Sequence, residues 1–325
     1  MKAIVCEKYG PPSALKLMEV SDPVISETEI LIETKACSIN FPDTLIIQGK
    51  YQFKGDLPFS PGSNVAGIVL EVGSEVSNLK AGDEVIGLAT HGGLAEKIKL
   101  DANRCILKPS NISMEQAASF LYTYATSYYA LHHRGQIQEN DTVLILGASG
   151  GVGLAAIDLA KLKGAKVIAA ASSDEKLEIC KKQGADFLLN YTEGDVKNKL
   201  KEMTNFAGVN LILDPVGGAY AEPSLRAIAW EGRYLVVGFA SGSIPSFPLN
   251  LALLKSCQVV GVFLGGFLRK DPKGATEMLH TVSDLFSEGK LNPYIYKTFS
   301  LEEAPQALQL MTDRKAIGKL VVNIN

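Results

Sequence analysis

The stretch Leu146-Gly147-Ala148-Ser149-Gly150-Gly151-Val152-Gly153-Leu154 is the most informative motif in the chain. Aligned to the pattern G-x-G-x-x-G, it places Ala148 at the first glycine position, Gly150 at the second and Gly153 at the third. Small residues are needed there because a pyrophosphate must approach backbone N–H groups at a helix amino terminus, and because the helix packs closely on the preceding strand. On its own the stretch also fits a glycine-rich turn that binds nothing. Its surroundings decide between the two interpretations.

From Asp141 onward, short apolar strands alternate with amphipathic helices. Strands are predicted over residues 142–146, 166–170, 186–189, 209–213, 232–237 and 258–263, and helices over 151–163 and 174–183. The uninterrupted Val, Ile and Leu runs suit a parallel sheet that is buried on both faces. The pattern therefore predicts a doubly wound α/β domain that binds a dinucleotide, with the strand order 3-2-1-4-5-6.

The first third of the chain has a different pattern, with short apolar runs separated by turn residues. The runs cover residues 2–6, 29–37, 65–72, 84–88 and 95–100. This spacing is typical of a β-rich, barrel-like domain. After it, Ser113 and Gln116 form a predicted capping box that opens a helix running to Arg134 and ending at Gly135.

The tail of the chain is too short to form a domain of its own. It contains predicted helices over residues 272–289 and 301–312 and a predicted final strand over 319–324. We expect this tail to return to the first third of the chain and complete its domain.

Composition indicates a globular protein. The 325 residues correspond to about two domains at ~150 residues each. Hydrophobic residues at 46% and charged residues at 21% exclude disordered and collagen-like classes. A net charge of −3 without a block of Lys and Arg argues against nucleic acid as a partner. No uncharged stretch offers ~20 mostly apolar residues, so we expect no membrane span.

The amino terminus and the cysteines indicate a reducing compartment. Glu7 stands where a signal peptide would need its apolar stretch. The 5 cysteines are widely spaced, odd in number and contain no C-x-x-C pair. We expect a cytoplasmic protein with free thiols.

The end of the second predicted strand determines which dinucleotide is expected. NAD-binding domains place an Asp or Glu about 20 residues after the glycine turn, where it bonds the ribose 2′-hydroxyl and repels a 2′-phosphate. Here Ser172 and Ser173 stand at that place, and Lys176 follows one helical turn later. These residues favour NADPH, whereas the neighbouring Asp174 does not. The alternative is that a serine only caps the helix, although capping and binding are compatible.

Several short motifs occur in order along nearly the whole chain. They are Ser38-Ile39-Asn40-Phe41-Pro42-Asp43-Thr44, Pro61-Gly62-x-Asn64-x-Ala66-Gly67, Ala81-Gly82-Asp83-x-Val85, Ala148-x-Gly150-Gly151-Val152-Gly153, Asp214-x-Val216-Gly217 and Gly318-Lys319-x-Val321. Together they resemble the medium-chain dehydrogenase/reductase superfamily, and within it the zinc-free, zeta-crystallin-like quinone oxidoreductase branch. The resemblance implies a GroES-like catalytic domain at residues 1–123 and 265–325, a Rossmann domain at 124–264, and NADPH in the cleft.

Departures from the family pattern bear on metal binding. Zinc-dependent relatives have Cys where this chain has Asn40 and His where it has Ser63, and they often add four closely spaced cysteines. Because zinc needs Cys, His or carboxylate ligands, we expect no metal in this chain. The branch usually has Glu where this chain has Asn64, which bears on hydrogen bonding inside the first domain.

The resemblance also implies which residues contact the cofactor. The adenosine 2′-phosphate would meet Ser172, Lys176 and Tyr191. The pyrophosphate would meet Ser149, Gly150, Gly151 and Val152. The nicotinamide would lie against Asn40, Thr126, Phe239, Phe263, Gly265 and Lys319. For Phe239 and Phe263, ordinary core packing is the alternative interpretation.

Tyr51 is the strongest candidate for a proton donor, with Asn40 a second candidate catalytic residue. Tyr51 resembles both a pocket tyrosine of quinone oxidoreductases and the proton-donating tyrosine of 2-enoyl thioester reductases. A phenol of pKa ~10 can protonate the enolate that a reduced enone leaves, whereas a quinone in a wet site needs no such donor. Another frequent pocket tyrosine of the branch is replaced by Leu45. Tyr124, in the helix before the glycine turn, is interpreted as a packing residue that could also face the cleft.

Three functions are consistent with these observations. The first is zinc-independent reduction of quinones or other α,β-unsaturated carbonyl compounds by NADPH. The second is reduction of a 2-enoyl thioester. The third is a non-catalytic NADPH-binding protein with a regulatory or structural role.

The sixth predicted strand bears on assembly. Residues 258–263 lie at a sheet edge and contain no charge or proline that would block pairing with another chain. Related reductases commonly join two Rossmann sheets edge to edge across a two-fold axis. We therefore expect a homodimer through this strand; the alternative is that a loop or the helix from Pro272 covers it.

Overall fold

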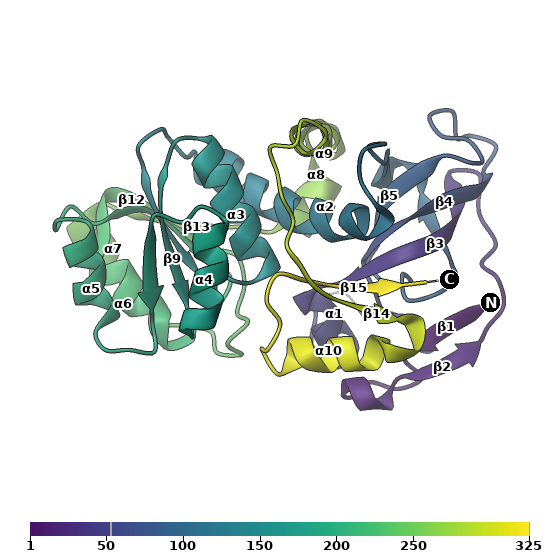
Figure 1. Cartoon of the computed structure of the whole chain (residues 1–325), viewed down its shortest axis with the longest axis horizontal. Coiled ribbons are helices and arrows are strands. Elements are labelled where there is room, and N and C mark those ends of the chain that lie inside the picture. Colours follow the sequence, from purple (N-terminus) through teal and green to yellow (C-terminus); the bar gives the residue numbers. More distant parts are fainter. Residues whose placement is uncertain (53, 325) are drawn as a thin grey trace. The chain divides into compact units, whose positions relative to one another are not determined.

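The computed structural model describes residues 1–52 and 54–324, and the chain forms two compact units (Figure 1). The first unit comprises Met1–Tyr122 with Pro293–Asn325, and the second comprises Thr123–Asn292. The carboxyl limit predicted at residue 325 lies outside the described residues.

The segment 265–292 packs with the second unit, whereas the sequence pattern assigned it to the first. Aromatic contacts within the second unit give the reason. The ring of Phe267 stacks on Tyr129 with centroids 4.5 Å apart and meets His133 edge-on at 5.4 Å. The Arg134 Nε also donates a hydrogen bond to the Gly261 carbonyl at 3.1 Å. These contacts hold the start of the segment to the second unit.

The first unit is built on strands, which the structure describes as two sheets. A two-stranded sheet pairs β1 (Lys2–Val5) with β2 (Lys16–Glu19). A seven-stranded sheet has the order β14-β15-β3-β4-β5-β7, with β6 also paired to β3. Its strands are β3 (Glu29–Ile39), β4 (Asn64–Val72), β5 (Glu84–Leu88), β6 (Lys97–Asp101), β7 (Cys105–Leu107), β14 (Ile295–Ser300) and β15 (Lys319–Asn323).

The tail joins this sheet directly. Strand β15 pairs antiparallel with β3, with Val322 opposite Cys37. Alternating side chains of β3, among them Ile30 and Ile32, are fully buried in one core with Leu320 and Val322 of β15. Since burying each such side chain contributes about 1.5–3 kcal/mol, the part of the tail from Pro293 onward is an integral part of the first unit. The helices of the first unit are α1 (Phe41–Ile46), α10 (Ala304–Thr312) and the short turns η1 (Pro12–Ala14), η2 (Ala102–Arg104) and η5 (Leu301–Glu303).

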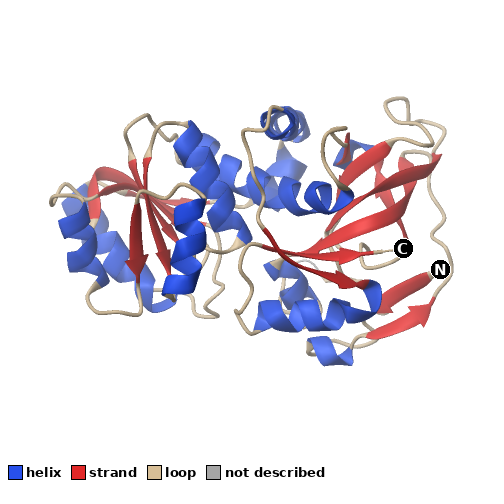
Figure 2. Cartoon of the chain, in the orientation of Figure 1, coloured by secondary structure: helices blue, strands red, loops and turns tan. Residues whose placement is uncertain are grey.

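The second unit is a six-stranded parallel sheet over the described residues, with helices on both faces (Figure 2). Its strands are β8 (Thr142–Leu146), β9 (Lys166–Ala171), β10 (Phe187–Asn190), β11 (Val209–Asp214), β12 (Ile228–Val236) and β13 (Gln258–Gly261). The order β10-β9-β8-β11-β12-β13 is the predicted 3-2-1-4-5-6, so the doubly wound fold is confirmed. The last strand is shorter than predicted and ends at Gly261.

The helices of the second unit follow the predicted alternation. They are α3 (Gly151–Leu162), α4 (Asp174–Lys182), α5 (Val196–Met203), α6 (Ala221–Arg226), α7 (Asn250–Lys255), α8 (Leu264–Lys270), α9 (Pro272–Ser287) and the 3-10 turn η4 (Gly218–Tyr220). The unit boundary falls within α2 (Met114–Tyr128), which continues as a π-helical segment η3 (Tyr129–Arg134). The predicted capping box is confirmed: the Ser113 N–H donates to Gln116 Oε1 at 3.1 Å, and the Gln116 N–H donates to Ser113 Oγ at 3.2 Å.

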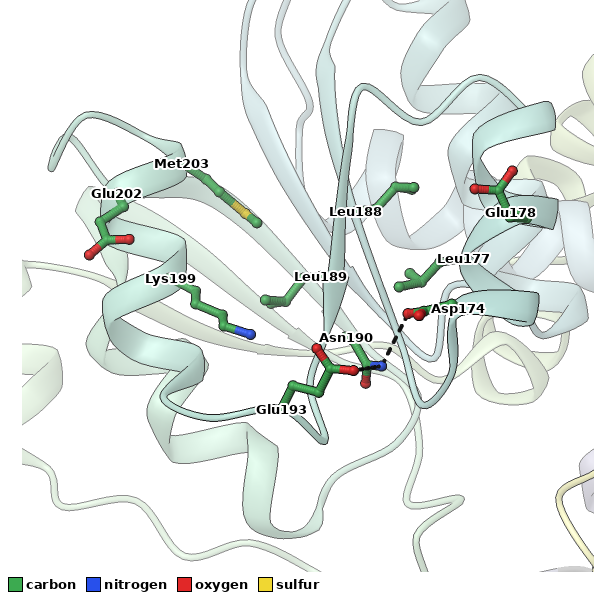
Figure 3. Close-up of a pocket in the computed structure, with 10 residues that line it drawn as sticks. All are labelled: Asp174, Leu177, Glu178, Leu188, Leu189, Asn190, Glu193, Lys199, Glu202 and Met203. Atoms are coloured by element: carbon green, nitrogen blue, oxygen red, sulfur yellow. Dashed lines mark hydrogen bonds between the residues drawn. The ribbon is translucent and has the colours of Figure 1, made fainter.

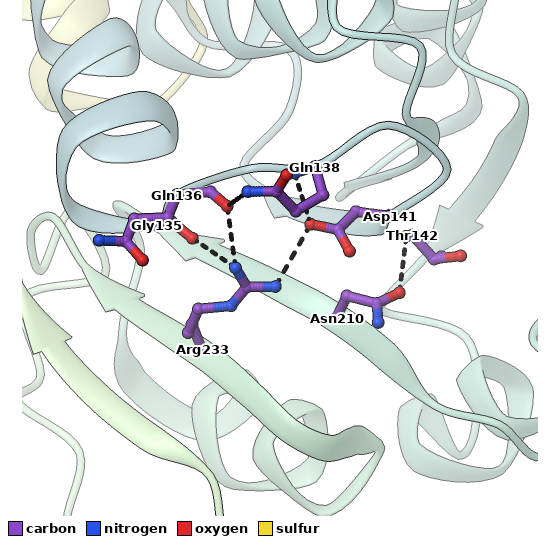
Figure 4. Close-up of polar contacts among 7 residues, drawn as sticks. All are labelled: Gly135, Gln136, Gln138, Asp141, Thr142, Asn210 and Arg233. Atoms are coloured by element: carbon purple, nitrogen blue, oxygen red, sulfur yellow. Dashed lines mark hydrogen bonds and ion pairs between the residues drawn. The ribbon is translucent and has the colours of Figure 1, made fainter.

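Arg233 on β12 fixes the segment that leads into β8 (Figure 4). Its guanidinium donates to the carbonyls of Gly135 at 2.7 Å and Gln136 at 3.0 Å, and to Asp141 Oδ2 at 3.2 Å. Gln136 has a positive φ of 47°, a conformation these bonds help to hold. The clamp anchors the start of β8, whose other end carries the glycine turn.

Within residues 1–52 and 54–324, no helix combines the length and the apolar character that crossing a bilayer requires.

Candidate active site

The glycine turn between β8 and α3 is shaped by close contacts. A Cβ on Gly153 would lie 2.5 Å from the Ala148 carbonyl oxygen and 2.6 Å from the Ala148 Cα. A Cβ on Gly147, whose φ is 59°, would lie 2.7 Å from Val216 Cγ2. Any side chain at either position would therefore push α3 or the neighbouring turn away from β8.

The amino terminus of α3 fits a pyrophosphate. Gly150 is the N-cap, and its carbonyl accepts the N–H of Leu154 at 2.9 Å. The first backbone N–H groups of a helix have no acceptor within the helix, and they concentrate positive potential at that end. Gly151 and Val152 occupy this first turn, and Ser149 before them is 5% exposed. The Ser127 hydroxyl donates to the Val152 carbonyl at 2.8 Å and fixes the turn from α2.

The ends of β9 and β10 bring three predicted residues to one edge of the sheet. Ala171 and Asn190 are opposite each other in the parallel register, so Ser172 and Tyr191 both follow immediately. The Lys176 Nζ donates to Ser172 Oγ at 3.2 Å. Burial lowers the pKa of the Lys176 ammonium, which Glu175 partly offsets. The ring of Tyr191 lies against Tyr220, with centroids 4.2 Å apart.

The two serines at this strand end have separate roles. Ser173 caps α4, since its hydroxyl accepts the Lys176 backbone N–H at 3.5 Å. Ser172 makes the side-chain contact with the Lys176 ammonium. The capping interpretation therefore applies to Ser173 and not to Ser172.

Asp174, the acid that argued against NADPH, is the first residue of α4 and is directed toward Asn190 of β10 (Figure 3). Its Oδ1 accepts the Asn190 side-chain amide at 3.3 Å, and that amide also donates to Glu193 at 2.9 Å. Asp174 lines a pocket of about 430 Å³ together with side chains of α4, β10 and α5. Its carboxylate thus lies toward this pocket and Asn190 in Figure 3.

The residues predicted around a nicotinamide within the second unit have different surroundings. Thr126 of α2 is 7% exposed. Phe239, after β12, packs close to Gly217, where a Cβ would lie 2.9 Å from its ring. Phe263, at the start of α8, is 43% exposed, which ordinary core packing does not explain. Gly265 lies in the first turn of α8.

Asp214 at the end of β11 holds the turn that faces Gly147. Its Oδ1 accepts the N–H groups of Val216 and Gly217, both at 2.8 Å, and its Oδ2 accepts the Tyr234 hydroxyl at 2.5 Å. Burial raises the pKa of the Asp214 carboxyl, and these hydrogen bonds work against the rise. Sequence reasoning used Asp214 only as part of a motif and did not find this role.

In the first unit, Lys319 and Asn40 form a buried pair. The Lys319 Nζ donates to Asn40 Oδ1 at 2.6 Å and to the Ile39 carbonyl at 3.1 Å. Lys319 is 3% exposed and Asn40 4%. Burial lowers the pKa of Lys319 to about 8, against the opposing effects of Asp43 and Cys37. The ammonium fixes the Asn40 amide so that its nitrogen faces Ser38 and Ser63.

Asp43 supplies the negative charge of this network, a role that sequence reasoning missed. It is fully buried on α1, and its Oδ2 accepts the Asn40 backbone N–H at 2.7 Å. Burial raises the pKa of Asp43 to about 6. Hydrogen bonds from Asn40 and Ser63 and the positive charge of Lys319 limit this rise. Between about pH 6 and 8 both charges are present, and the buried network is neutral overall.

Replacing Lys319 with Met is expected to produce a pH-dependent stability difference. The folded chain releases the Lys319 proton near pH 8, whereas the ordinary value is 10.5, so between these values the unfolded chain binds more protons. The free energy of unfolding of the unmodified chain, relative to the variant, should therefore increase from about pH 8 to about 10.5. Urea titrations at pH 7, 8, 9 and 10 measure this difference. A difference that stays constant over this range would contradict the assignment.

The positions that carry zinc ligands in relatives do not fit a metal here. The Asn40 side-chain nitrogen donates to Ser63 Oγ at 3.4 Å, so the two replacement residues bond each other. The Lys319 ammonium next to them would repel a cation. Throughout the part of the chain that is described, no group of three or more His, Cys, Asp or Glu side chains could hold a metal ion. Asn64, at the position where the branch usually has Glu, donates to Ser38 Oγ at 3.5 Å.

Tyr51 is paired with a second phenol. Its hydroxyl is hydrogen-bonded to that of Tyr122 in α2, a residue that sequence reasoning did not single out. Burial raises the pKa of both phenols, and the charge of Asp43 adds to the effect. Tyr124 is a packing residue, as predicted: it is 1% exposed, and its hydroxyl donates to Asp158 Oδ2 at 2.5 Å.

Known protein families match residues in both units. The family described as "Alcohol dehydrogenase GroES-like domain" matches residues 26–110, and "Zinc-binding dehydrogenase" matches residues 151–281. The chain is 39% identical to "Quinone oxidoreductase-like protein 2 homolog" of Nematostella vectensis, over 99% of this chain and 88% of the relative. The chain belongs to the zinc-free quinone oxidoreductase branch of the medium-chain dehydrogenase/reductase superfamily.

Solved structures of similar proteins have the same fold over nearly the whole chain. Escherichia coli quinone oxidoreductase complexed with NADPH superposes with a TM-score of 0.93 at 31% identity, covering 99% of this chain and 100% of that one. The CurK enoyl reductase superposes with a TM-score of 0.90 at 27% identity, covering 100% and 99%. The predicted GroES-like and Rossmann architecture and the predicted family are confirmed.

Proposed function

We propose that this chain is a zinc-independent, NADPH-dependent reductase of quinones or other α,β-unsaturated carbonyl compounds. The observation that carries the proposal is the end of β9, where the Lys176 ammonium bonds Ser172 and the neighbouring acid, Asp174, accepts a hydrogen bond from Asn190. The NADPH found in the Escherichia coli relative supports the choice of cofactor.

The residues of the second unit would bind the cofactor. Ser172, Lys176 and Tyr191 would hold the 2′-phosphate through charge-assisted hydrogen bonds. The turn from Ser149 to Val152 would hold the pyrophosphate at the helix amino terminus. Thr126, Phe239, Phe263 and Gly265 would contact the nicotinamide, and for Asn40 and Lys319 this contact stays a prediction. When bound, NADPH would supply the hydride, and the chain's own residues supply position and a proton.

Tyr51 would deliver that proton. Its pKa is raised by burial, so the phenol stays protonated over the physiological range. A protonated phenol can donate to an enolate carbon or oxygen of the substrate. Asn40, held by Lys319, would orient the reacting groups.

A 2-enoyl thioester reductase is the second candidate function. The similarity to the CurK enoyl reductase supports it, and Tyr51 would serve as the acid there as well. A non-catalytic NADPH-binding protein is the alternative of another class. All 5 cysteines are free thiols, which supports the cytoplasm as the location.

A side-by-side assay of NADPH oxidation separates these functions. The chain, dialysed against a metal chelator, is mixed with 1,4-benzoquinone, with a simple enone and with crotonyl-CoA. The proposal expects turnover with the quinone or the enone, undiminished by the chelator. Turnover confined to crotonyl-CoA would establish the second function. Tight NADPH binding without turnover on any of the three would establish the non-catalytic alternative.

The outer edge of β13 supports a homodimer. β13 is an edge strand of the sheet, and its residues from Gln258 to Gly261 are at least partly exposed. Val259 of β13 is 49% exposed, and Leu253 and Leu254 of the preceding helix α7 are 78% and 66% exposed. An uncovered apolar edge of this kind favours pairing with a second copy across a two-fold axis.

Placing proline at Val259 is expected to convert the dimer to monomers. The Val262 N–H bonds the Val236 carbonyl of β12, so the Val260 N–H also faces β12, and the Val259 N–H faces the outer edge. Proline removes a backbone donor and stiffens an edge strand that the second copy would pair with. Sedimentation velocity at micromolar concentration measures the result, with a Val259→Thr variant as a control that keeps the backbone donor. An unmodified chain that sediments at 34.8 kDa without concentration dependence would refute the dimer.

A further inference from the structure

The chain passes between its two units at two places, which we call the crossings. It leaves the first unit after Tyr122 and returns to it after Asn292. At each crossing, a residue of the second unit is hydrogen-bonded to the carboxylate of Asp158 on α3. Asp158 therefore joins two parts of the chain that are far apart in the sequence.

Asp158 accepts hydrogen bonds from three residues. Its Oδ2 accepts the Tyr124 hydroxyl at 2.5 Å and the Asn292 backbone N–H at 3.1 Å, and its Oδ1 accepts the Gln183 side-chain amide at 2.7 Å. The groups themselves set the direction of these bonds, because a carboxylate accepts and a backbone N–H can only donate. The Gln183 nitrogen also donates to the Asn292 carbonyl at 2.9 Å, which fixes the orientation of that amide.

Both crossings are held closely by these bonds. Tyr124 follows the first crossing directly after Thr123 and is 1% exposed. Asn292 is the last residue before the second crossing, and its N–H and its carbonyl are both bonded by side chains, those of Asp158 and Gln183. The backbone of Asn292 is thus fixed although it belongs to neither a helix nor a strand.

Asp158 lies in the helix that begins at the glycine turn. The Ser127 hydroxyl of α2 donates to the Val152 carbonyl in the first turn of α3 at 2.8 Å, so α2 is bonded to α3 at both Val152 and Asp158. Burial raises the pKa of the Asp158 carboxyl, and its three hydrogen bonds oppose this rise. The crossings are therefore tied to the same helix whose amino terminus we expect to hold the pyrophosphate.

We propose that Asp158 is a positioning residue for hydride transfer: it holds both crossings to α3 and thereby fixes the two points from which the chain of the first unit, with Tyr51, extends. This inference rests on the proposed reductase function. Hydride transfer requires cofactor and substrate to be held within a narrow range of distances and angles, so a small displacement of the reacting groups lowers the rate. Asp158 acts through the crossings that it holds and not through contact with cofactor or substrate.

The experiment compares Asp158→Ala with the unmodified chain. Alanine has no side-chain acceptor, so the three donors lose their partner while α3 keeps a good helix former. We expect the single-turnover rate of NADPH oxidation, which reports hydride transfer, to fall by about 10- to 100-fold with an enone and equally with 1,4-benzoquinone. The dissociation constant of NADPH should stay within about twofold, because the glycine turn and the ends of β9 and β10 are unchanged. An unchanged single-turnover rate would overturn the proposal.

Asp186→Ala serves as the matched control. Asp186 is likewise bonded to α3, since it accepts the Lys161 ammonium at 2.8 Å, and it also accepts the Val167 N–H at 2.7 Å. Neither partner is part of a crossing, so the single-turnover rate of this variant should equal that of the unmodified chain. The same loss of rate in both variants would overturn the proposal, because it would reflect a general loss of stability in the second unit.

A second variant, Tyr124→Phe, breaks the bond at the first crossing alone. It keeps the carboxylate of Asp158 and the buried ring, and we expect it to lower the single-turnover rate by about threefold or more, but by less than Asp158→Ala does. An unchanged rate in Tyr124→Phe would overturn the proposal even if Asp158→Ala failed to fold.

Hydrogen exchange measured by NMR separates this inference from the proposed function, because it needs neither substrate nor cofactor. In Asp158→Ala, we expect the Asn292 amide to exchange about 10- to 100-fold faster, because its acceptor is gone. In Tyr124→Phe, the same amide should stay within about twofold of its rate in the unmodified chain. An unchanged exchange rate in Asp158→Ala would overturn the role of Asp158. Faster exchange, together with no turnover of the unmodified chain on a quinone, an enone or crotonyl-CoA, would instead overturn the proposed function and with it the positioning role, while the hydrogen bonds would stand.

Discussion

Replacing Ser172 with Asp is expected to change the cofactor preference from NADPH to NADH. The new carboxylate would stand at the end of β9 next to the Lys176 ammonium, where it would neutralise the positive charge and repel a 2′-phosphate. It could also accept a hydrogen bond from a ribose 2′-hydroxyl. Two charge-assisted bonds at ~1.5–3 kcal/mol each correspond to at least a hundredfold loss of NADPH affinity. Fluorescence titration with NADPH and with NADH measures the two dissociation constants.

The control for this prediction is Ser172→Ala. It removes the hydroxyl without adding a charge, so NADPH should bind more weakly by about tenfold and NADH should gain nothing. The helix cap is untouched in both variants because Ser173 supplies it. Equal dissociation constants for NADPH and NADH in the unmodified chain would contradict the assignment of this strand end.

Replacing Tyr51 with Phe is expected to lower turnover with an enone by ~10²-fold or more. The substitution removes the proton donor and keeps the ring that packs on the core of the first unit. NADPH affinity should stay nearly constant because the glycine turn and the strand-end residues are unchanged. Steady-state kinetics with an enone and with a quinone, together with a fluorescence titration, measure the three quantities.

The measurement with the quinone distinguishes an acid role of Tyr51 from a structural one. Retained quinone turnover beside lost enone turnover would show that Tyr51 acts as an acid. Full enone activity in the phenylalanine variant would show that Tyr51 lines the pocket and does not donate the proton. Equal losses on both substrates would indicate a structural defect, which a thermal melt would detect.

The second unit was predictable because its signals are local. Each strand is a short Val, Ile and Leu run, and the backbone of the glycine turn can be inferred from residue size alone. The contacts that Gly153 makes with Ala148 are those that the pattern requires. The strand ends at Ser172 and Tyr191 follow from the parallel register. Periodicity, glycine placement and strand register were therefore sufficient to predict the fold of the second unit and the strand ends where we expect the cofactor.

The polar network of the first unit was not predictable in the same way. Lys319 and Asn40 are separated by 279 positions and meet only because β15 pairs with β3. Tyr51 and Tyr122 lie on a loop and a helix that no local pattern connects. The domain limit near residue 265 was misplaced for a related reason, since stacking of Phe267 on Tyr129 depends on side chains far apart in the chain.

Transfer of deuterium from NADPH to an enone tests whether this chain is a reductase. The chelator-dialysed chain is incubated with but-3-en-2-one and with NADPH deuterated at C4 on one face or the other, and the product is examined by NMR. We expect butan-2-one that carries deuterium at the carbon that was the β-position, from one of the two labelled cofactors. Absence of the reduced product together with no oxidation of NADPH by 1,4-benzoquinone, or a product without deuterium from either cofactor, would contradict this function.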